Sequence, residues 1–264
     1  MPRFKLTIAY DGSGFHGWQT QTQPTADGPQ TLRTVQSTVR EALGRTLQQP
    51  ITVIGASRTD TGVHALGQVA HFDAETRIPH DRLAMAINSR LPRDVEIRRA
   101  EPVPGEFDAI RDTICKQYRY RLWTAARRPL QHRHYTTHCW TPLDHAAMSA
   151  ASERLVGEHD FAGFANAGHG RQSTVRSIHH CRVERSWTPG PELHVVVSAD
   201  GFLYNMVRII VGTLIEIGRG AAKPELVDAI LAAGDRTQAG PTAPPQGLWL
   251  EWIRHCDVPA GKGD

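Results

Sequence analysis

The residues between two short apolar runs, at 51–54 and 67–72, are of types that could do chemistry. They read Arg58, Thr59, Asp60, Thr61 and Gly62. No apolar periodicity passes through them, so they are predicted to form a loop. An arginine beside an aspartate in a partly buried loop favours the charged carboxylate, which suits catalysis. The same residue types are also ordinary in a turn, and the residues alone leave both interpretations open.

A second stretch is basic and aromatic. Residues 111–133 include seven basic residues and one acidic residue, Asp112. Tyr118, Tyr120 and Trp123 are interleaved with the basic residues. The basic residues are Arg111, Lys116, Arg119, Arg121, Arg127, Arg128 and Arg133. Such a pattern can bind phosphates and stack bases, or it can be the solvated edge of a strand. The net charge of +3 for the whole chain does not distinguish nucleic-acid binding from a solvated strand edge.

Two further patterns are predicted to carry no cofactor. Gly12, Gly14 and Gly17 match GxGxxG after a strand, but residues 18–24 lack the helical periodicity that a dinucleotide site requires. A nucleotide-dependent oxidoreductase is therefore disfavoured. The 14 histidines and four cysteines lack zinc-ligand spacing, so no metal is expected. Scattered cysteines, no apolar signal region and no long apolar run predict a cytoplasmic protein without a membrane span.

The elements that must position these residues follow from periodicity. A strand at 4–10, a helix at 31–48, strands at 51–54 and 67–72, a helix at 81–91 and a strand at 95–103 give the order β-α-β-β-α-β. That is the ferredoxin-like arrangement. Pro102, Pro104 and Gly105 mark a boundary, so residues 1–105 are predicted to form one α+β lobe. Residues 19–30 and 238–246 are predicted to be flexible loops.

Residues 106–264 are predicted to form a second α+β lobe. Its strands are expected near 116–124, 134–140, 175–187, 192–199 and 248–254, and its helices at 144–156, 205–218 and 224–233. The fold class is therefore α+β, with two ferredoxin-like lobes and mainly antiparallel sheets.

Residues 55–72 closely resemble the catalytic motif of the TruA family of tRNA pseudouridine synthases, which carries Arg-Thr-Asp-x-Gly-Val-His-Ala. Other blocks of the chain resemble the same family: residues 10–19, 34–36, 116–120, 159–161, 174–176, 202–208 and 244–248. The chain departs from the family pattern in a longer segment between Gln19 and Thr34. It also departs at Asp108 and Ile110, where many members have His and Arg.

The resemblance implies isomerisation of uridine to pseudouridine in the tRNA anticodon stem-loop, at positions 38 to 40, without cofactor or metal. It makes Asp60 the catalytic residue, either as nucleophile or as base toward the ribose. Arg208 would pair with Asp60, and Arg58 would help to open and hold the target site. Tyr118 would stack on the flipped uracil, and Leu248 would pack on its other side.

The same resemblance implies a homodimer and a central RNA-binding cleft between the lobes. Lys116, Arg119 and Arg121 are the expected contacts to the RNA backbone, although strand alternation lets only some of them face a cleft. The competing hypothesis is a non-catalytic RNA-binding or RNA-folding protein on the same scaffold. Such a protein would not need Asp60, which is present here.

Overall fold

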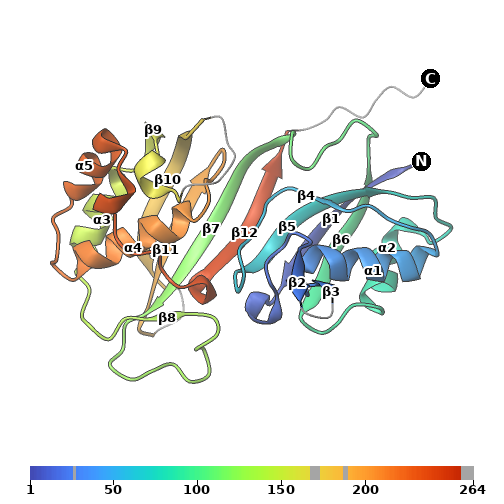
Figure 1. Cartoon of the computed structure of the whole chain (residues 1–264), viewed down its shortest axis with the longest axis horizontal. Helices are drawn as coiled ribbons and strands as arrows, with labels where there is room; N and C mark the ends of the chain where they lie inside the picture. Colours follow the sequence, from blue (N-terminus) through green and yellow to red (C-terminus); the bar gives the residue numbers. More distant parts are fainter. Residues whose placement is uncertain (26–27, 167–172, 187–189, 257–264) are drawn as a thin grey trace. The chain divides into compact units, whose positions relative to one another are not determined.

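The computed structural model describes residues 1–25, 28–166, 173–186 and 190–256 of an α+β protein (Figure 1). Most of its strand pairs are antiparallel, and the short strand β8 runs parallel to β7. The chain divides into two compact units, Met1–Ile114 with Leu250–Asp264, and Cys115–Trp249. The boundary predicted from the sequence lies after residue 105, and that prediction assigned the whole last strand to the second lobe. No helix of the described residues is long and apolar enough to cross a membrane.

The first unit has the element order β-α-β-β-α-β that the periodicity predicts. The elements are β1 (Arg3–Tyr10), α1 (Val35–Leu47), β4 (Ile54–Gly55), β5 (His64–Asp73), α2 (His80–Asn88) and β6 (Val95–Val103). The strand order is β6-β1-β5, with β4 on β5 and with β12 (Leu248–His255) on the other edge of β5. Helices α1 and α2 lie next to each other (Figure 1). This arrangement places the end of β1 and the β4–β5 loop close together.

Local chemistry explains where these elements begin and end. Phe4, Leu6 and Ile8 are buried on β1 and alternate with half-exposed residues, as a strand with one covered face requires. Helix α1 begins later than predicted because Thr34 and Ser37 form a reciprocal capping box. It ends at Gln48, which adopts a left-handed conformation with φ of 55°.

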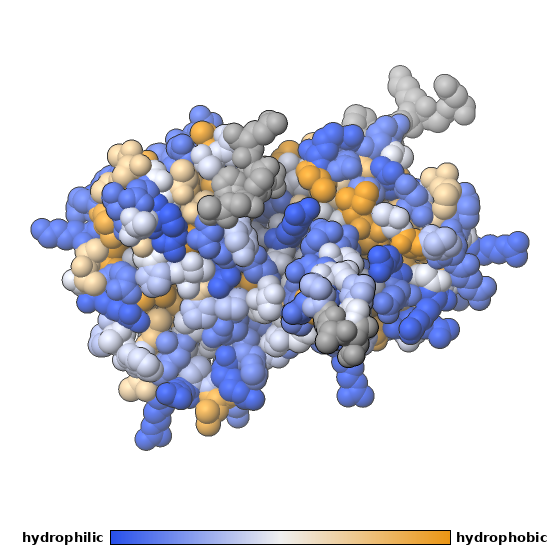
Figure 2. Space-filling model, in the orientation of Figure 1, coloured by the Kyte–Doolittle hydropathy of each residue, from blue (hydrophilic) through white to orange (hydrophobic). Residues whose placement is uncertain are grey.

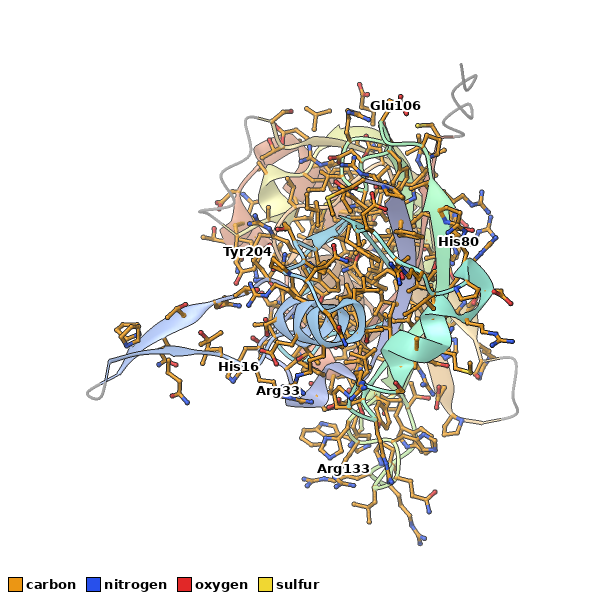
Figure 3. The ribbon with its side chains drawn as sticks, turned by 90° about the vertical axis from the view of Figure 1, so that its right-hand side faces the viewer. His16, Arg33, His80, Glu106, Arg133 and Tyr204 are labelled. Carbon is orange, nitrogen blue, oxygen red and sulfur yellow. The ribbon has the colours of Figure 1, made fainter. Side chains whose placement is uncertain are left out.

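The prediction of a flexible loop at residues 19–30 was wrong where strands are described, and residues 26 and 27 lie outside the described residues. This segment contains a hairpin of β2 (Thr22–Thr25) and β3 (Gly28–Thr31), which projects away from α1 in Figure 3. Its residues lack the apolar alternation by which a strand is recognised, because neither face of the hairpin packs on the core. The pairing depends on its base, where the Leu32 amide donates to the Gln21 carbonyl at 3.0 Å.

The second unit builds its sheet in the order β7-β11-β10-β9. Its elements are β7 (Thr113–Trp123), β8 (Thr137–His138), α3 (His145–Glu153), β9 (Gly157–Asp160), β10 (Val175–Arg185), β11 (Glu192–Ala199), α4 (Met206–Gly218) and α5 (Leu226–Ala233). Strand β9 has no counterpart in the sequence prediction, since its residues are mostly polar and exposed. Helix α4 is almost entirely buried and forms the centre of this unit.

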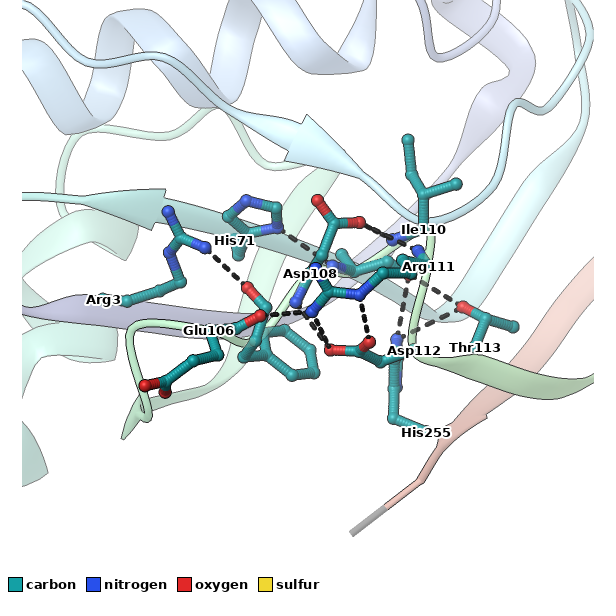
Figure 4. A network of polar contacts seen from close by, with 11 residues as sticks. Arg3, His71, Glu106, Asp108, Ile110, Arg111, Asp112, Thr113 and His255 are labelled. Atoms are coloured by element: carbon teal, nitrogen blue, oxygen red, sulfur yellow. Dashed lines mark hydrogen bonds and ion pairs between the residues drawn. The ribbon is translucent and has the colours of Figure 1, made fainter. Parts of the chain in front are cut away.

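Asp108, where many members of the resembled family have His, has a local structural role (Figure 4). The Asp108 carboxylate accepts hydrogen bonds from the amides of Ile110 and Arg111, each at 2.8 Å. These two amides lower the pKa of Asp108, the Arg111 amide most, and outweigh the opposing effect of burial. Arg111 in turn pairs with Asp112 at 2.8 Å. Asp108 therefore shapes a turn, and the side chain of Arg111 is held by its neighbour.

His71 makes part of the stability dependent on pH. Its ring is buried, and Nδ1 accepts the Ala109 amide at 3.1 Å. Burial, together with the charge of Arg3, lowers the pKa of His71 below its usual 6.5. As the pH is lowered, His71 is therefore protonated at a higher pH in the unfolded chain than in the folded chain. The free energy of unfolding should fall as the pH drops below about 6.5.

We expect urea denaturation to show a flatter pH dependence for His71→Gln than for the natural protein between pH 7.5 and 5.5. The difference should approach, at most, about 1.4 kcal/mol per pH unit, the limit for one proton. His179→Gln is the control because His179 is exposed. An unchanged slope in His71→Gln would show that His71 does not titrate differently in the folded chain.

Candidate active site

The loop between β4 and β5 carries the residues that the sequence singled out. Thr59 is buried, Asp60 is half-buried, and both Arg58 and Thr61 are exposed. The chain thus anchors Thr59 inside the first unit and brings Asp60 to the surface immediately after it. A carboxylate in this position is accessible to a substrate while its backbone belongs to the folded core.

Hydrogen bonds fix the backbone on both sides of Asp60. The Tyr10 hydroxyl, at the end of β1, lies 2.8 Å from Thr59 Oγ1, and the Trp18 amide donates to the Thr59 carbonyl at 3.0 Å. On the other side, the Val63 amide donates to the Asp60 carbonyl at 3.1 Å. The loop is therefore held in place by side-chain and backbone groups from β1 and the segment after it.

The glycines of the GxGxxG pattern pack against this loop. A Cβ atom on Gly12 would lie 2.0 Å from the Val63 carbonyl oxygen. Gly17 has φ of +83°, and a Cβ there would lie 2.6 Å from the Thr59 carbonyl oxygen. Among the residues described between this turn and Val35, where α1 begins, none is in an α-helix. The glycines thus allow two backbones to touch, a role that requires no phosphate ligand.

Gln68 is a supporting residue that the sequence reasoning did not identify. Its side chain is fully buried on β5, and its Nε2 donates to the Ser57 carbonyl at 2.6 Å. Its Oε1 accepts the amides of Ser57 and Val69 at 3.2 and 3.1 Å. A buried amide with these partners fixes the start of the Arg58–Asp60 loop. The available signal was a polar side chain inside the apolar run at 67–72, a feature that Gln68 shares with His71.

The aromatic and aliphatic residues expected around the uracil belong to the second unit. Tyr118 lies on β7, is 6% exposed and meets the Phe202 ring edge-on at a centroid distance of 5.1 Å. Leu248 begins β12 and is also 6% exposed. Both side chains are held by packing, and their contacts with a uracil stay predictions.

Arg208 is oriented by residues of its own unit. It lies in the first turn of α4 and is half-buried. Its Nε donates to the Ala243 carbonyl at 2.7 Å, and its Nη1 donates to Asn205 Oδ1 at 2.8 Å. The segment around Ala243 was predicted to be a loop and is irregular, but its backbone is bonded to α4. The pairing of Arg208 with Asp60 joins residues of the two units and stays a prediction.

Two of the three residues expected to contact the RNA backbone are engaged in ion pairs on the sheet. Arg119 Nη1 lies 2.7 Å from Glu184 Oε1, and Arg121 Nη2 lies 2.9 Å from Glu192 Oε2. Lys116 is half-buried on β7. The carboxylates balance the two arginine charges locally, while the RNA contacts of all three residues stay predictions.

His194 links these two pairs. Arg119 Nη1 lies 2.8 Å from His194 Nδ1, and His194 Nε2 lies 3.2 Å from Glu192 Oε2. Because arginine can only donate, Nδ1 accepts and the ring proton is on Nε2. Burial lowers the pKa of His194, which agrees with a neutral ring. Burial alone would raise the pKa of Glu192, but the hydrogen bonds from His194 and Arg121 outweigh it and lower that pKa.

Comparison with known proteins places this loop in a family. The family described as tRNA pseudouridine synthase matches residues 6–110 and 151–255. The chain is 45% identical to tRNA pseudouridine synthase A of Moorella thermoacetica over 255 residues, covering 97% of this chain and 100% of the relative. It is 42% identical to the protein of that name from Syntrophomonas wolfei, covering 95% and 96%. The chain therefore belongs to the tRNA pseudouridine synthase family, as its Arg58–Asp60 loop predicts.

Proposed function

We propose that this protein isomerises uridine to pseudouridine in the anticodon stem-loop of tRNA, at positions 38 to 40, with Asp60 as the catalytic carboxylate. Family membership supports an isomerase that acts on tRNA. The observation that supports the role of Asp60 is its position. Its side chain is half-exposed at the point where the loop backbone is bonded on both sides. Such preorganisation holds a reacting group in place without a cost at the moment of reaction.

The reaction exchanges one glycosidic bond for another and consumes nothing. The N1–C1′ bond breaks, the uracil turns, and C5 bonds to C1′ while C5 loses a proton and N1 gains one. As a nucleophile, Asp60 would bond to C1′ as the uracil leaves with the electron pair, and C5 would later displace it. As a base, Asp60 would remove the C2′ proton of the ribose while the uracil leaves with the electron pair of the N1–C1′ bond, which gives a glycal. The protonated Asp60 would return that proton to C2′ when C5 bonds to C1′. Both routes use the same carboxylate in its charged form.

The remaining site residues have roles that depend on this chemistry. Arg58, exposed beside Asp60, would hold the target nucleotide open, and Arg208 would pair with the Asp60 carboxylate. Tyr118 and Leu248 would enclose the flipped uracil and offset the few kcal/mol that flipping costs. By the same family resemblance, the enzyme would act in the cytoplasm as a homodimer.

The test uses tRNA in which a single uridine carries tritium at C5. We expect tritium release to water when the label is at position 38, 39 or 40, and none when it is at a uridine of the acceptor arm. Release only outside the anticodon stem-loop would contradict the proposed substrate position. Binding without release from any position would instead favour the alternative of a non-catalytic RNA-binding protein.

A further inference from the structure

The basic stretch of the sequence consists of two structurally different groups. On β7, the charges of Arg119 and Arg121 are balanced by Glu184 and Glu192. The other group lies in the loop that follows β7, at residues 124–136, which we call the basic loop. It contains Arg127, Arg128 and Arg133, whereas the charge of Arg111, before β7, is balanced by Asp112.

The arginines of the basic loop are exposed and lack acidic neighbours. All three side chains are exposed, and the sequence contains no acid between Asp112 and Asp144. In the described part of the chain, no ion pair joins any of these three arginines to a carboxylate. The loop also carries exposed His132 and His134. It therefore presents an uncompensated positive charge, in contrast to the arginines of β7.

The backbone of the basic loop is ordered by its own contacts. Pro129 is buried, and the His132 amide donates to its carbonyl at 2.9 Å. The Trp123 indole donates to the Arg127 carbonyl at 3.0 Å and stacks on the His132 ring at a centroid distance of 5.7 Å. Figure 3 shows Arg133 on this loop, extending away from the strands. A folded loop presents its arginines at a smaller entropic cost of binding than a disordered one.

Position and surroundings favour a polyanion as the ligand. The basic loop lies outside the two segments that match the family. Hydrophilic side chains predominate along the lower edge of the face shown in Figure 2, where Figure 1 places the segment between β7 and β8. An apolar interface is therefore disfavoured, since Ala126 and Leu130 are the exposed aliphatic residues of the basic loop and the other exposed residues there are polar. Guanidinium groups bind phosphate by paired hydrogen bonds and stay charged at any working pH.

We propose that the basic loop binds the phosphate backbone of the RNA substrate through Arg127, Arg128 and Arg133. This inference deepens the proposed function and rests on it for the identity of the RNA. The contacts to the RNA backbone that the sequence predicts for Arg119 and Arg121 are thereby assigned to the arginines of the basic loop, whose charges no carboxylate balances. The contacts are to phosphate, so they contribute affinity and salt dependence rather than base specificity.

The test measures tRNA affinity at several salt concentrations for the triple variant R127Q/R128Q/R133Q. Each lost phosphate contact should reduce the slope of log K against log salt concentration by about 1, so a reduction of about 2 to 3 is expected. The turnover rate at saturating tRNA should remain unchanged, because none of the three residues is placed at the reacting nucleotide. The matched control is R40Q/R45Q/R90Q, which removes the same charge from exposed positions of the first unit.

Several outcomes would overturn the proposal. They are a slope equal to that of the control, a loss of turnover with unchanged binding, and an altered oligomeric state in sedimentation with an unchanged slope. The last would identify the basic loop as a protein interface. Binding is also measured in an Asp60→Asn background, where no reaction is expected. The binding assay in this background tests only the role of the basic loop, whereas tritium release tests the catalytic role of Asp60, so the two proposals can fail independently. Circular dichroism checks that each variant is folded.

Discussion

Asp60→Asn should lower tritium release from the target uracil by about 10³-fold or more, while tRNA binding remains close to that of the natural protein. The substitution keeps the size and shape of the side chain but removes its charge, and an amide can act neither as nucleophile nor as base at C1′ or the ribose. The backbone bonds around the loop come from Thr59 and from the Asp60 carbonyl. These bonds do not involve the carboxylate, so they remain available in Asp60→Asn.

Single-turnover tritium release and a filter-binding assay on the same preparation measure the two effects separately. Asp81→Asn, at an exposed position in the first turn of α2, is the matched control and should behave as the natural protein. Normal release by Asp60→Asn would remove the catalytic role of this residue. Loss of binding in a folded Asp60→Asn protein would indicate that Asp60 contributes to recognition instead.

Gly17→Ala should destabilise the protein and lower its activity in the molecules that remain folded. The residue has φ of +83°, and the new methyl group would lie 2.6 Å from the Thr59 carbonyl oxygen. That oxygen accepts the Trp18 amide and precedes Asp60 in the chain. Relief of the clash must displace the Arg58–Asp60 loop, and with Asp60 in its proposed role a displacement of about 1 Å costs about 10²-fold in rate. We expect a loss of about 3 kcal/mol or more in stability from the clash and the strained backbone together.

Gly220→Ala separates these two causes. Gly220 has nearly the same backbone conformation, with φ of +77°, but nothing lies within 4 Å of a Cβ atom there. It should therefore show only the strain of the left-handed backbone, about 1 to 2 kcal/mol, with normal tritium release. Urea denaturation and tritium release below the unfolding transition measure both variants. Equal effects on stability and activity in the two would show that the contact between Gly17 and Thr59 does not position the loop.

Much of the first unit could be predicted because its signals are local. The alternation of Phe4, Leu6 and Ile8 and the helical spacing of Val35, Val39 and Leu43 depend only on near neighbours in sequence. The structure confirms these elements. The hairpin at β2 and β3 lacked such a signal, because polar strands that bury neither face carry no periodicity. Its stability comes from backbone bonds at its base, which composition does not reveal.

For the candidate site, the linear motif was enough to propose the chemistry, whereas the contacts that support the loop are visible only in the folded chain. The spacing of Arg58 and Asp60 lies within one loop, so a linear motif suffices to identify it. The contact of Gly17 with Thr59 depends on a backbone approach across about 40 residues, which no local pattern encodes. Likewise, alternation along β7 cannot show that Glu184 and Glu192 balance Arg119 and Arg121, because strand register sets cross-strand partners. Only the folded sheet separates these balanced arginines from the exposed arginines of the basic loop.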